Sequence, residues 1–563
     1  MPKIKSKIQR ESWHSKLAWF AVFAVFAALG ARTLSVHMYP DNRVKYQSQH
    51  QYWAQAPVST SRGSIRDRND VPLAISVPSV SFFIDPMYWN PASADVLAPY
   101  FGTDIAEKFS KRLGGRFHWV VRKVPVDIAK PLTDKKVPGL FTHKESLRVY
   151  PHGELASHVI GFCDIDGVGL SGVEREWNSV LFSPPQTRFL VRDARGKMLD
   201  LIGSNAGTLQ AGAGSIKLTV DSKVQQIVEW KLREGANMAK AKWGVGVCVN
   251  PNTGEIIAMA SYPWMDLNDR SSFANANTLR NNVIGMVYEP GSTLKPVMLG
   301  IAKEMGFARE GEKFMCRGKI SISDGIIRDV SAHGYLDQEG LIIKSCNTGM
   351  ATIGNRLNPS KAYGMLKQFG FGTRTGVEIA GEEDGLLRAP EEWLGVTKAN
   401  IAIGQGLAVT PLQLVMAMSA VANGGYLLKP YIIEEVKNST GKAIYQGKRR
   451  VRNAVLNPKT CVWLRAAMSK TVAIGSGKAA QVEGVELAGK TGTAQMAVRG
   501  SYMKGQYVSS FIGFWPFTRP NYILLIALGE PSGGRYYGGE IAAPVFKGIV
   551  EELSQLSLVA ASN

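Results

Sequence analysis

The sequence predicts an α+β fold in which strands from the two ends of one domain meet in a single antiparallel sheet. Apolar segments at 243–249 and 254–260 flank an Asn-Pro-Asn-Thr turn, a pattern typical of a β-hairpin. Two further apolar segments, 510–514 and 522–527, flank a second turn near the C-terminus. The part between these pairs, about 292–425, looks mostly helical. We therefore expect helices packed on a sheet that the two ends of the domain complete.

The chain begins with a basic segment followed by an apolar run. Five basic residues precede the run at 17–31, and apolar residues as far as Met38 extend it towards the roughly 20 residues that a bilayer span needs. We predict a transmembrane anchor at 17–38, a cytoplasmic tail at 1–16 and the rest of the chain outside the membrane, because basic residues favour the inside. A cleaved signal peptide is the alternative, since Ala28-Leu29-Gly30 resembles a cleavage site. With either an anchor or a signal peptide, the rest of the chain is exported across the membrane.

The formal charge of +20 points first to nucleic acid, but the sequence contains no nucleic-acid-binding motif. Arginine and lysine are spread along the chain rather than gathered in one stripe. An anionic membrane surface or an acidic wall polymer explains the charge equally well. With 45% hydrophobic and 20% charged residues, the composition excludes wholesale disorder. We predict a folded protein with no nucleic-acid partner.

Neither the cysteines nor the histidines show metal-ligand spacing. The cysteines are Cys163, Cys248, Cys316, Cys346 and Cys461. Their number is odd, their spacing is wide and no Cys-x-x-Cys occurs, which argues against a disulfide framework and against a zinc site. Most are expected to be small buried apolar residues. The eight histidines are equally scattered, so we predict no metal and no cofactor.

Residues 39–214 read as mixed strands and loops and predict a non-catalytic domain. The polar stretch 61–70 predicts a surface hairpin that leads into a strand. Glycines in a second dense stretch, 148–174, predict backbone turns. Neither stretch contains a nucleophile beside a base, so both are interpreted as structural.

A boundary near 211–214 separates this part from a second domain at 215–556. That domain opens with a strand and an amphipathic helix capped by Asp221. Residues 557–563 remain as a short tail.

The most informative stretch places a serine and a lysine three residues apart after a Pro-Gly turn. If a helix begins at Ser292, Ser292 and Lys295 lie on the same face, one turn apart. A neutral lysine can take the proton of a serine hydroxyl and so activate it as a nucleophile. The helix N-terminus adds N–H groups and a positive dipole end suited to an oxyanion.

Ser-x-x-Lys alone is a weak signal, because it also occurs at Ser439–Lys442 and Ser501–Lys504. Only Ser292 is followed by both Ser345-Cys346-Asn347 and Lys490-Thr491-Gly492-Thr493. This ordered triplet is typical of penicillin-binding proteins and class A β-lactamases. Separately, the residues can be a helix cap, a turn residue and a solvated charge. Jointly, their order favours a catalytic site.

With these motifs the chain resembles a class B penicillin-binding protein, a monofunctional D,D-transpeptidase of bacterial cell-wall synthesis. The resemblance covers nearly everything after the anchor, including 62–74, 148–174, 218–221, 289–296, 404–406, 410–413, 489–495 and 538–546. It implies a pedestal domain at 39–214 and a transpeptidase domain like that of serine β-lactamases at 215–556. Two residues depart from the usual pattern. Asp70 replaces a glycine, and Cys346 replaces the aspartate of the Ser-Asp-Asn form.

The resemblance implies how the acyl-enzyme forms. Ser292 attacks the penultimate D-Ala of a stem pentapeptide, while Lys295, kept neutral by burial and by the cation Lys490, takes the proton. Ser345 relays the proton to the leaving amine, and Asn347 holds Lys295 and the substrate backbone. β-Lactams inhibit such an enzyme by acylating the same serine.

The resemblance also implies a substrate-binding strand. Lys490 with the hydroxyls of Thr491 and Thr493 suits the terminal carboxylate of the substrate, and Gly492 allows a close backbone approach. The N–H groups of Ser292 and Thr493 would form the oxyanion hole. We expect these residues on an edge strand.

Four functions stay open. Asp67-Arg68-Asn69, the stretch 73–78 and Arg192-Asp193 with Gly196 resemble the division (septal) branch, and the elongation branch is the alternative within the class. A β-lactamase or β-lactam sensor shares the motifs but needs neither anchor nor pedestal. The fourth alternative is a catalytically silent scaffold of the division machinery. Such a scaffold would not need the candidate catalytic residues, which are all intact in this chain.

The resemblance further implies a single-pass protein of the bacterial cytoplasmic membrane, with its catalytic domain on the periplasmic or extracytoplasmic side. Its substrates would be stem pentapeptides on a lipid-linked precursor or nascent glycan. No glycosyltransferase sequence precedes the pedestal, so a polytopic membrane glycosyltransferase and division proteins are the expected partners.

Overall fold

A computed structural model describes residues 4–39, 42–43, 53–58, 60–111, 113–115, 117–183, 186–192, 198–199, 213–498 and 501–562. The chain divides into two compact units, Met1–Thr60 with Pro184–Gln210 and Ser61–Ser183 with Ala211–Asn563. Asp193 and Gly196, two of the residues that resemble the division branch, lie outside the described residues. So does the first half of the predicted boundary stretch, Ala211-Gly212.

The first unit contains a long helix and a small sheet. Helix α1 spans Ile4–Met38 and covers the whole of the predicted anchor, 17–38. The described residues of the predicted tail continue the same helix. Among the described residues, α1 is the one helix long and apolar enough to cross a membrane, over Trp13–Met38 with a mean hydropathy of 1.8. The sheet consists of β1 (Trp53–Val58), β6 (Gln186–Arg192) and β7 (Met198–Leu199), all antiparallel.

The second unit is built on the five-stranded antiparallel sheet that the sequence predicts. Its strands, in spatial order, are β10 (Ile256–Tyr262), β9 (Trp243–Val249), β21 (Tyr522–Gly529), β20 (Ser501–Trp515) and β19 (Ala488–Val498). Each neighbouring pair is antiparallel. Strands from the two ends of the domain therefore complete one sheet, as expected, and β19 lies at its edge.

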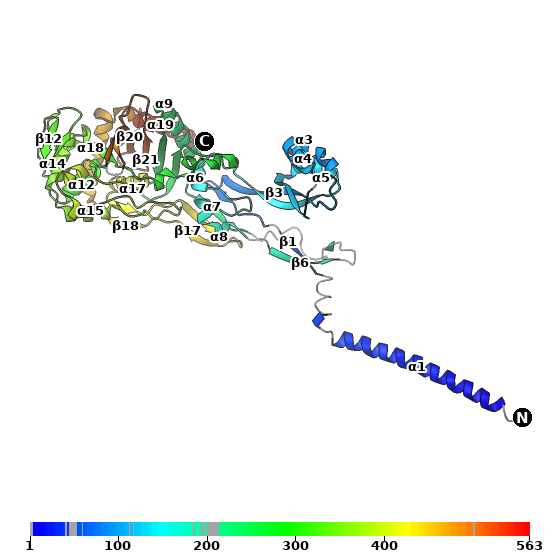
Figure 1. The fold of residues 1–563 in the computed structure, drawn as a ribbon. Helices are drawn as coiled ribbons and strands as arrows, with labels where there is room; N and C mark the ends of the chain where they lie inside the picture. The colour runs from blue at the N-terminus through cyan, green and yellow to red at the C-terminus, as the bar shows by residue number, and fades with distance from the viewer. Residues whose placement is uncertain are drawn as a thin grey trace. The chain divides into compact units, whose positions relative to one another are not determined.

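Helices cover both faces of this sheet (Figure 1). Helices α9 (Ser222–Ala239) and α19 (Ala542–Ser562) pack together on one face, where Leu524 is buried with them. The buried helix α17 (Pro411–Ala422) packs on the other face, where Leu525 is buried. Successive strand residues point to opposite faces, so this alternation divides the apolar strands between two cores. Asp221 caps α9 through Lys223 N and Val224 N, which confirms the predicted cap. Residues 557–562, predicted as a tail, continue α19.

The middle of the domain combines helices with short strands and with a long stretch, 369–389, that has no helix. Its helices are α12 (Lys295–Glu304), α13 (Gln338–Ile343), α14 (Asn347–Arg356), α15 (Pro359–Gln368), α16 (Thr397–Ala402) and α17, and α18 (Pro458–Ile474) follows. Four short strands interrupt them: β11 (Phe314–Cys316), β12 (Lys319–Ile322), β13 (Gly325–Arg328) and β14 (Gly334–Leu336). The β12–β13 hairpin turns at Ser323-Asp324, so the expectation of a mostly helical middle is wrong there. Asp and Gly residues favour a turn, and here Ser323 and Asp324 form the turn while Gly325 begins β13.

A second sheet crosses the predicted domain boundary. Its strands run in the order β17 (Ala443–Gln446), β16 (Ile433–Lys437), β8 (Ser215–Leu218), β2 (Ile65–Arg66), β3 (Pro72–Ile84) and β4 (His118–Pro125), and β5 (Leu140–Val149) also pairs with β3. Strand β2 pairs in parallel with β8, so a strand from each side of residue 214 shares one ladder. The boundary itself stays a prediction.

The remaining described elements are short. They are α3 (Ala98–Phe101), α4 (Thr103–Phe109), α5 (Val126–Asp134), α6 (Ser157–Ile160), α7 (Gly172–Glu176), α8 (Asn178–Leu181), α10 (Ala276–Leu279), α11 (Asn282–Gly285), β15 (Tyr426–Leu428) and β18 (Val451–Ala454).

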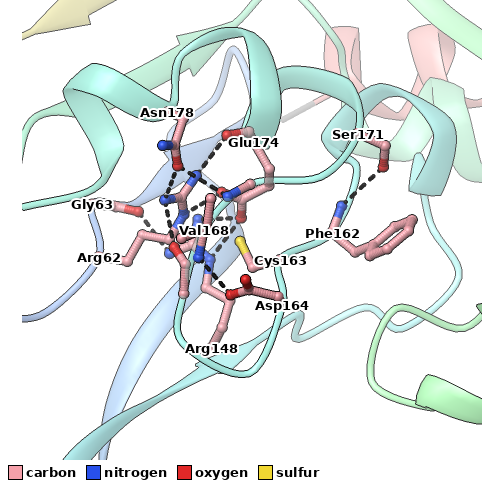
Figure 2. Close-up of polar contacts among 12 residues, drawn as sticks. Arg62, Gly63, Arg148, Phe162, Cys163, Asp164, Val168, Ser171, Glu174 and Asn178 are labelled. Atoms are coloured by element: carbon pink, nitrogen blue, oxygen red, sulfur yellow. Dashed lines mark hydrogen bonds and ion pairs between the residues drawn. The ribbon is translucent and has the colours of Figure 1, made fainter.

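A buried ion network joins the two polar stretches that the sequence assigns to structure (Figure 2). The carboxylate of Glu174, with 0% side-chain exposure, accepts hydrogen bonds from Nε of Arg62 and, at 2.7 Å, from Nε of Arg148. Arg62 also donates to the side chain of Asn178 at 2.8 Å. The hairpin in 61–70 forms as predicted. The prediction that this hairpin lies on the surface is wrong for two of its residues. Arg62 and Asp67 are buried, because they bind Glu174 and Ser222, which lie far along the chain.

We expect Glu174→Gln to destabilise the second unit strongly. The substitution leaves two buried guanidinium groups without their carboxylate, and breaking a buried ion pair costs about 3–5 kcal/mol. The free energy of unfolding of the detergent-solubilised chain, from guanidinium titration followed by tryptophan fluorescence, measures the loss. Glu176→Gln on the exposed end of the same helix is the matched control and should change stability by less than about 0.5 kcal/mol. Equal losses in both variants would contradict the prediction.

Candidate active site

The Ser-x-x-Lys stretch forms the turn and first residues of a buried helix. Gly291–Leu294 is a 3₁₀ turn, and α12 follows directly from Lys295. Ser292 therefore lies one turn ahead of Lys295, as the spacing predicts. Ser292 is half-buried, whereas the side chain of Lys295 is fully buried.

Lys295 contacts the second motif rather than the Ser292 hydroxyl. Its Nζ donates to the carbonyl oxygen of Ser345 at 2.5 Å, to Oδ1 of Asn347 at 2.6 Å and to Oγ of Ser345 at 3.3 Å. Nδ2 of Asn347 in turn donates to the carbonyl oxygen of Arg328 at 2.9 Å. The Ser292 hydroxyl forms no hydrogen bond with any residue that the structure describes, so it is available to a substrate.

Ser345 occupies a strained turn between α13 and α14. Its φ is +56°, a left-handed conformation that costs a non-glycine residue about 1–3 kcal/mol and is concentrated at functional sites. The next residue, Cys346, is the N-cap of α14 and accepts from the N–H of Gly349. Ser345 Oγ accepts a second hydrogen bond, from Lys490 Nζ at 2.8 Å. The strained turn thus presents one hydroxyl to two lysines.

The third motif lies on the edge strand β19, as predicted. Lys490 is fully buried there, and the Thr491 hydroxyl lies 2.9 Å from that of Ser476. A Cβ on Gly492 would lie 2.8 Å from the side chain of Thr293, so the missing side chain lets the Ser292 turn pack against β19. Thr493 Oγ1 accepts from the N–H of Gly538 at 3.0 Å.

Burial lowers the pKa of both lysines. The pKa of Lys295 falls to about 8 through burial, although the charge of Asp329 opposes the shift. Burial, and then the positive charge of Lys295, lower the pKa of Lys490 well below its usual value. Each shift favours the neutral amine. Burial thus favours the neutral form of both amines.

Asp329 is a residue of this site that the sequence did not reveal. Its Oδ1 accepts from the N–H of Asn347 at 2.9 Å, and its Oδ2 accepts from the N–H of Thr348 at 3.0 Å. Burial raises the pKa of Asp329, but these hydrogen bonds and the charge of Lys295 outweigh it and lower the pKa. No motif marks this residue, because its partners belong to a separate segment.

Glu289 connects the Ser292 turn to another loop. Its carboxylate accepts from the N–H of Gly406 at 2.8 Å and from the hydroxyl of Tyr502 at 3.1 Å. The N–H of Gly291 donates to the carbonyl oxygen of Gly404 at 2.9 Å. The Gly-Gln-Gly stretch 404–406, noted in the sequence without a role, therefore supports the turn that carries Ser292.

Two family models match the chain. Residues 244–551 match the model described as penicillin binding protein transpeptidase domain. Residues 57–208 match the model described as penicillin-binding protein dimerisation domain. The chain belongs to the penicillin-binding protein family. This confirms the resemblance drawn from the motifs and the predicted α+β class.

Named members of the family resemble most of the chain. The chain is 30% identical over 554 residues to the peptidoglycan D,D-transpeptidase FtsI of Escherichia coli (strain K12), covering 96% of this chain and 91% of that protein. It is 33% identical over 506 residues to the stage V sporulation protein D of Bacillus subtilis (strain 168), covering 88% and 78%. A crystal structure of penicillin binding protein 3 from Mycobacterium tuberculosis, complexed with aztreonam, superposes with a TM-score of 0.68 at 27% identity and covers 90% of this chain and 98% of that one.

We expect Gly404→Ala to slow acylation by a penicillin. Gly404 has a φ of +85°, and a Cβ there would lie 1.9 Å from the carbonyl oxygen of Gly291, so the Ser292 turn must move. A misplacement of about 1 Å can cost about 100-fold in rate. The rate of labelling by a fluorescent penicillin measures the effect. Gly424→Ala is the matched control, because it shares the left-handed backbone (φ +91°) but meets no atom within 4 Å. Equal labelling rates in the two variants would contradict this role.

Proposed function

We propose that this chain is a peptidoglycan D,D-transpeptidase that cross-links stem peptides through a serine acyl-enzyme. The observation that carries the proposal is the meeting of two buried lysines at one hydroxyl. Lys295 and Lys490 both donate to Ser345 Oγ, and Lys295 lies one turn after Ser292. The family match and the similarity to named D,D-transpeptidases support the same reaction.

The acylation step assigns a role to each residue. Ser292 Oγ attacks the carbonyl carbon of the penultimate D-Ala, and neutral Lys295 takes the hydroxyl proton. The tetrahedral intermediate collapses as the C–N bond to the terminal D-Ala breaks. The leaving amine receives this proton from Lys295 through Ser345, whose hydroxyl can both donate and accept, so Lys295 is neutral again in the acyl-enzyme. Asn347 holds Lys295 in place through the 2.6 Å hydrogen bond.

The second half-reaction restores the enzyme. The amine of a second stem peptide attacks the ester on Ser292, an amide forms between the two peptides, and the C–O bond to the serine breaks. Lys295, which is neutral in the acyl-enzyme, takes a proton from the attacking amine and gives it to the serine oxygen as the C–O bond breaks. The products are one cross-link and one free D-Ala.

The edge strand β19 supplies the substrate-binding surface. An extended peptide can add to an exposed strand edge through backbone hydrogen bonds. Lys490 with the hydroxyls of Thr491 and Thr493 binds the substrate's terminal carboxylate, while Gly492 lets the Ser292 turn pack against this strand. The N–H groups of Ser292 and Thr493 bind the oxyanion.

The same proposal includes a cellular setting. Helix α1 anchors the chain in the bacterial cytoplasmic membrane by a single span, with the N-terminus inside and the catalytic domain outside. The similarity to FtsI supports septal synthesis during division, with a polytopic glycosyltransferase and division proteins as partners. Stem pentapeptides are the substrates, and β-lactams are covalent inhibitors.

Ser292 should carry a single stable adduct after exposure to benzylpenicillin. Intact-protein mass spectrometry of the detergent-solubilised chain should show one added antibiotic mass, because the acyl-enzyme waits for an amine acceptor that is absent. Ser292→Ala should show none. Ser439→Ala is the matched control, since Ser439 begins another Ser-x-x-Lys stretch but is exposed at a turn, and it should keep the adduct. Free protein with hydrolysed drug would indicate a β-lactamase, and neither adduct nor hydrolysis would indicate a scaffold.

The acylation rate should rise with pH as Lys295 loses its proton. Because its pKa is about 8, the neutral fraction falls about tenfold for each pH unit below that value. The rate should therefore rise roughly tenfold per unit between about pH 6 and pH 8 and then level off. Stopped-flow labelling with a fluorescent penicillin, corrected for the reagent's own hydrolysis, gives the profile. A rate that is flat below pH 8, or that falls as pH rises through it, is incompatible with a Lys295 base.

A further inference from the structure

Four side chains with metal-binding atoms meet behind the Ser345-Cys346-Asn347 motif. They are Cys316 on β11, Asp329 after β13, His333 before β14 and Cys346 at the N-cap of α14. One ligand atom from each lies within 4.8 Å of all the others. Both cysteines are buried, while Asp329 and His333 are half-buried. We propose that these four side chains bind one zinc ion, and that the ion braces the second catalytic motif.

The distances among the donor atoms suit a tetrahedral ion. Sγ of Cys316 lies 3.4 Å from Oδ2 of Asp329 and 3.4 Å from Nδ1 of His333, and Sγ of Cys346 lies 3.1 Å from the same Oδ2. With Zn–S near 2.3 Å and Zn–N or Zn–O near 2.0 Å, the edges of a tetrahedral site are about 3.3–3.8 Å. The other three donor pairs lie within 4.8 Å of one another, so shortening them by up to about 1 Å converts the observed cluster into such a site.

Neighbouring groups already orient three of the four ligands. The other ring nitrogen of His333 lies 3.3 Å from the hydroxyl of Ser331, which leaves Nδ1 facing Cys316. Oδ1 of Asp329 accepts from the N–H of Asn347, so Oδ2 faces the two thiols. The N–H of Gly349 donates to Sγ of Cys346 at 3.4 Å and so directs this sulfur atom. Such outer hydrogen bonds typically fix metal ligands in place.

The donor types select the metal. Two sulfur atoms, one imidazole and one carboxylate in a tetrahedral arrangement favour zinc over magnesium or calcium, which require oxygen ligands. A disulfide between Cys316 and Cys346 would account for the two sulfur atoms but gives no reason for His333 and Asp329 to converge on them. The four-donor arrangement therefore favours the ion.

The ion would stiffen the site without changing its charge. With two neutral thiols the cluster carries the single negative charge of Asp329. With Zn²⁺ and two thiolates it carries the same net charge, because binding releases two protons. The field that Asp329 exerts on Lys295 is thus preserved. The ion links β11, the β13–β14 loop and α14, and so holds Asn347 against Lys295 as a positioning element.

The metal content of the full-length, detergent-solubilised chain tests this inference. After removal of any affinity tag, mass spectrometry of the elements should find about one zinc per chain, and Co²⁺ replacing it should give a thiolate-to-cobalt charge-transfer band. Cys316→Ala and His333→Ala should lose the metal and the band. Cys248→Ala is the matched control, because Cys248 is equally buried but lies in the central sheet away from the cluster, and it should keep both.

Three results would overturn the inference. They are wild-type protein with neither zinc nor a cobalt band, zinc retained by both Cys316→Ala and His333→Ala, and a Cys316–Cys346 disulfide found by peptide mapping without reductant. The benzylpenicillin adduct on Ser292, measured on the same samples, reports separately on the proposed function. Zinc-free wild-type protein should still form that adduct, but at least about tenfold more slowly, as expected for loss of a supporting shell.

Discussion

The proposed catalytic arrangement depends on two lysines buried without a directly bonded carboxylate. Lys295 and Lys490 come from a helix and a distant edge strand, and both point at the hydroxyl of Ser345. Burying an ammonium group is costly unless a counter-charge pairs with it, so the buried amine tends to lose its proton. Neutral acceptors here, the Ser345 carbonyl and the Asn347 amide oxygen, take the place of a salt bridge. Burial disfavours the charged form of these lysines, and for the same reason it leaves neutral amines that can act as bases.

Close backbone packing holds the three motifs at this distance. The Ser292 turn lies against β19 at Gly492 and against the loop at Gly404, and at both places a Cβ would clash with the turn. Ser345 keeps a left-handed backbone between two helices. Each of these features costs conformational freedom or strain, and the well-packed cores on the two faces of the central sheet supply the rigidity that maintains them.

The sequence predicted the periodic and ordered features of this chain. The hairpin at 243–262, the C-terminal strands and the order of the three motifs could be predicted, because each depends on local pattern or spacing. The contacts of Asp329 with Asn347, and of Arg62 with Glu174, could not be predicted, because they join segments with no shared pattern. The β12–β13 hairpin is an intermediate case. Its Asp324-Gly325 pair was readable, but the helical periodicity around it dominated the interpretation.

The fold explains why Cys346 can replace the aspartate of the Ser-Asp-Asn form. An aspartate at this position would cap α14 and satisfy its free N–H groups. Here Asp329, from a separate strand, accepts from the N–H groups of Asn347 and Thr348, while the thiol of Cys346 lies 3.1 Å from that carboxylate. A carboxylate at 346 would place a second negative charge against Asp329 and raise the pKa of one of the two. A neutral thiol avoids this repulsion, and in the zinc-bound state proposed above the charge of Zn²⁺ compensates the thiolate, so in both states Cys346 and Asp329 together cap the helix that begins with Asn347.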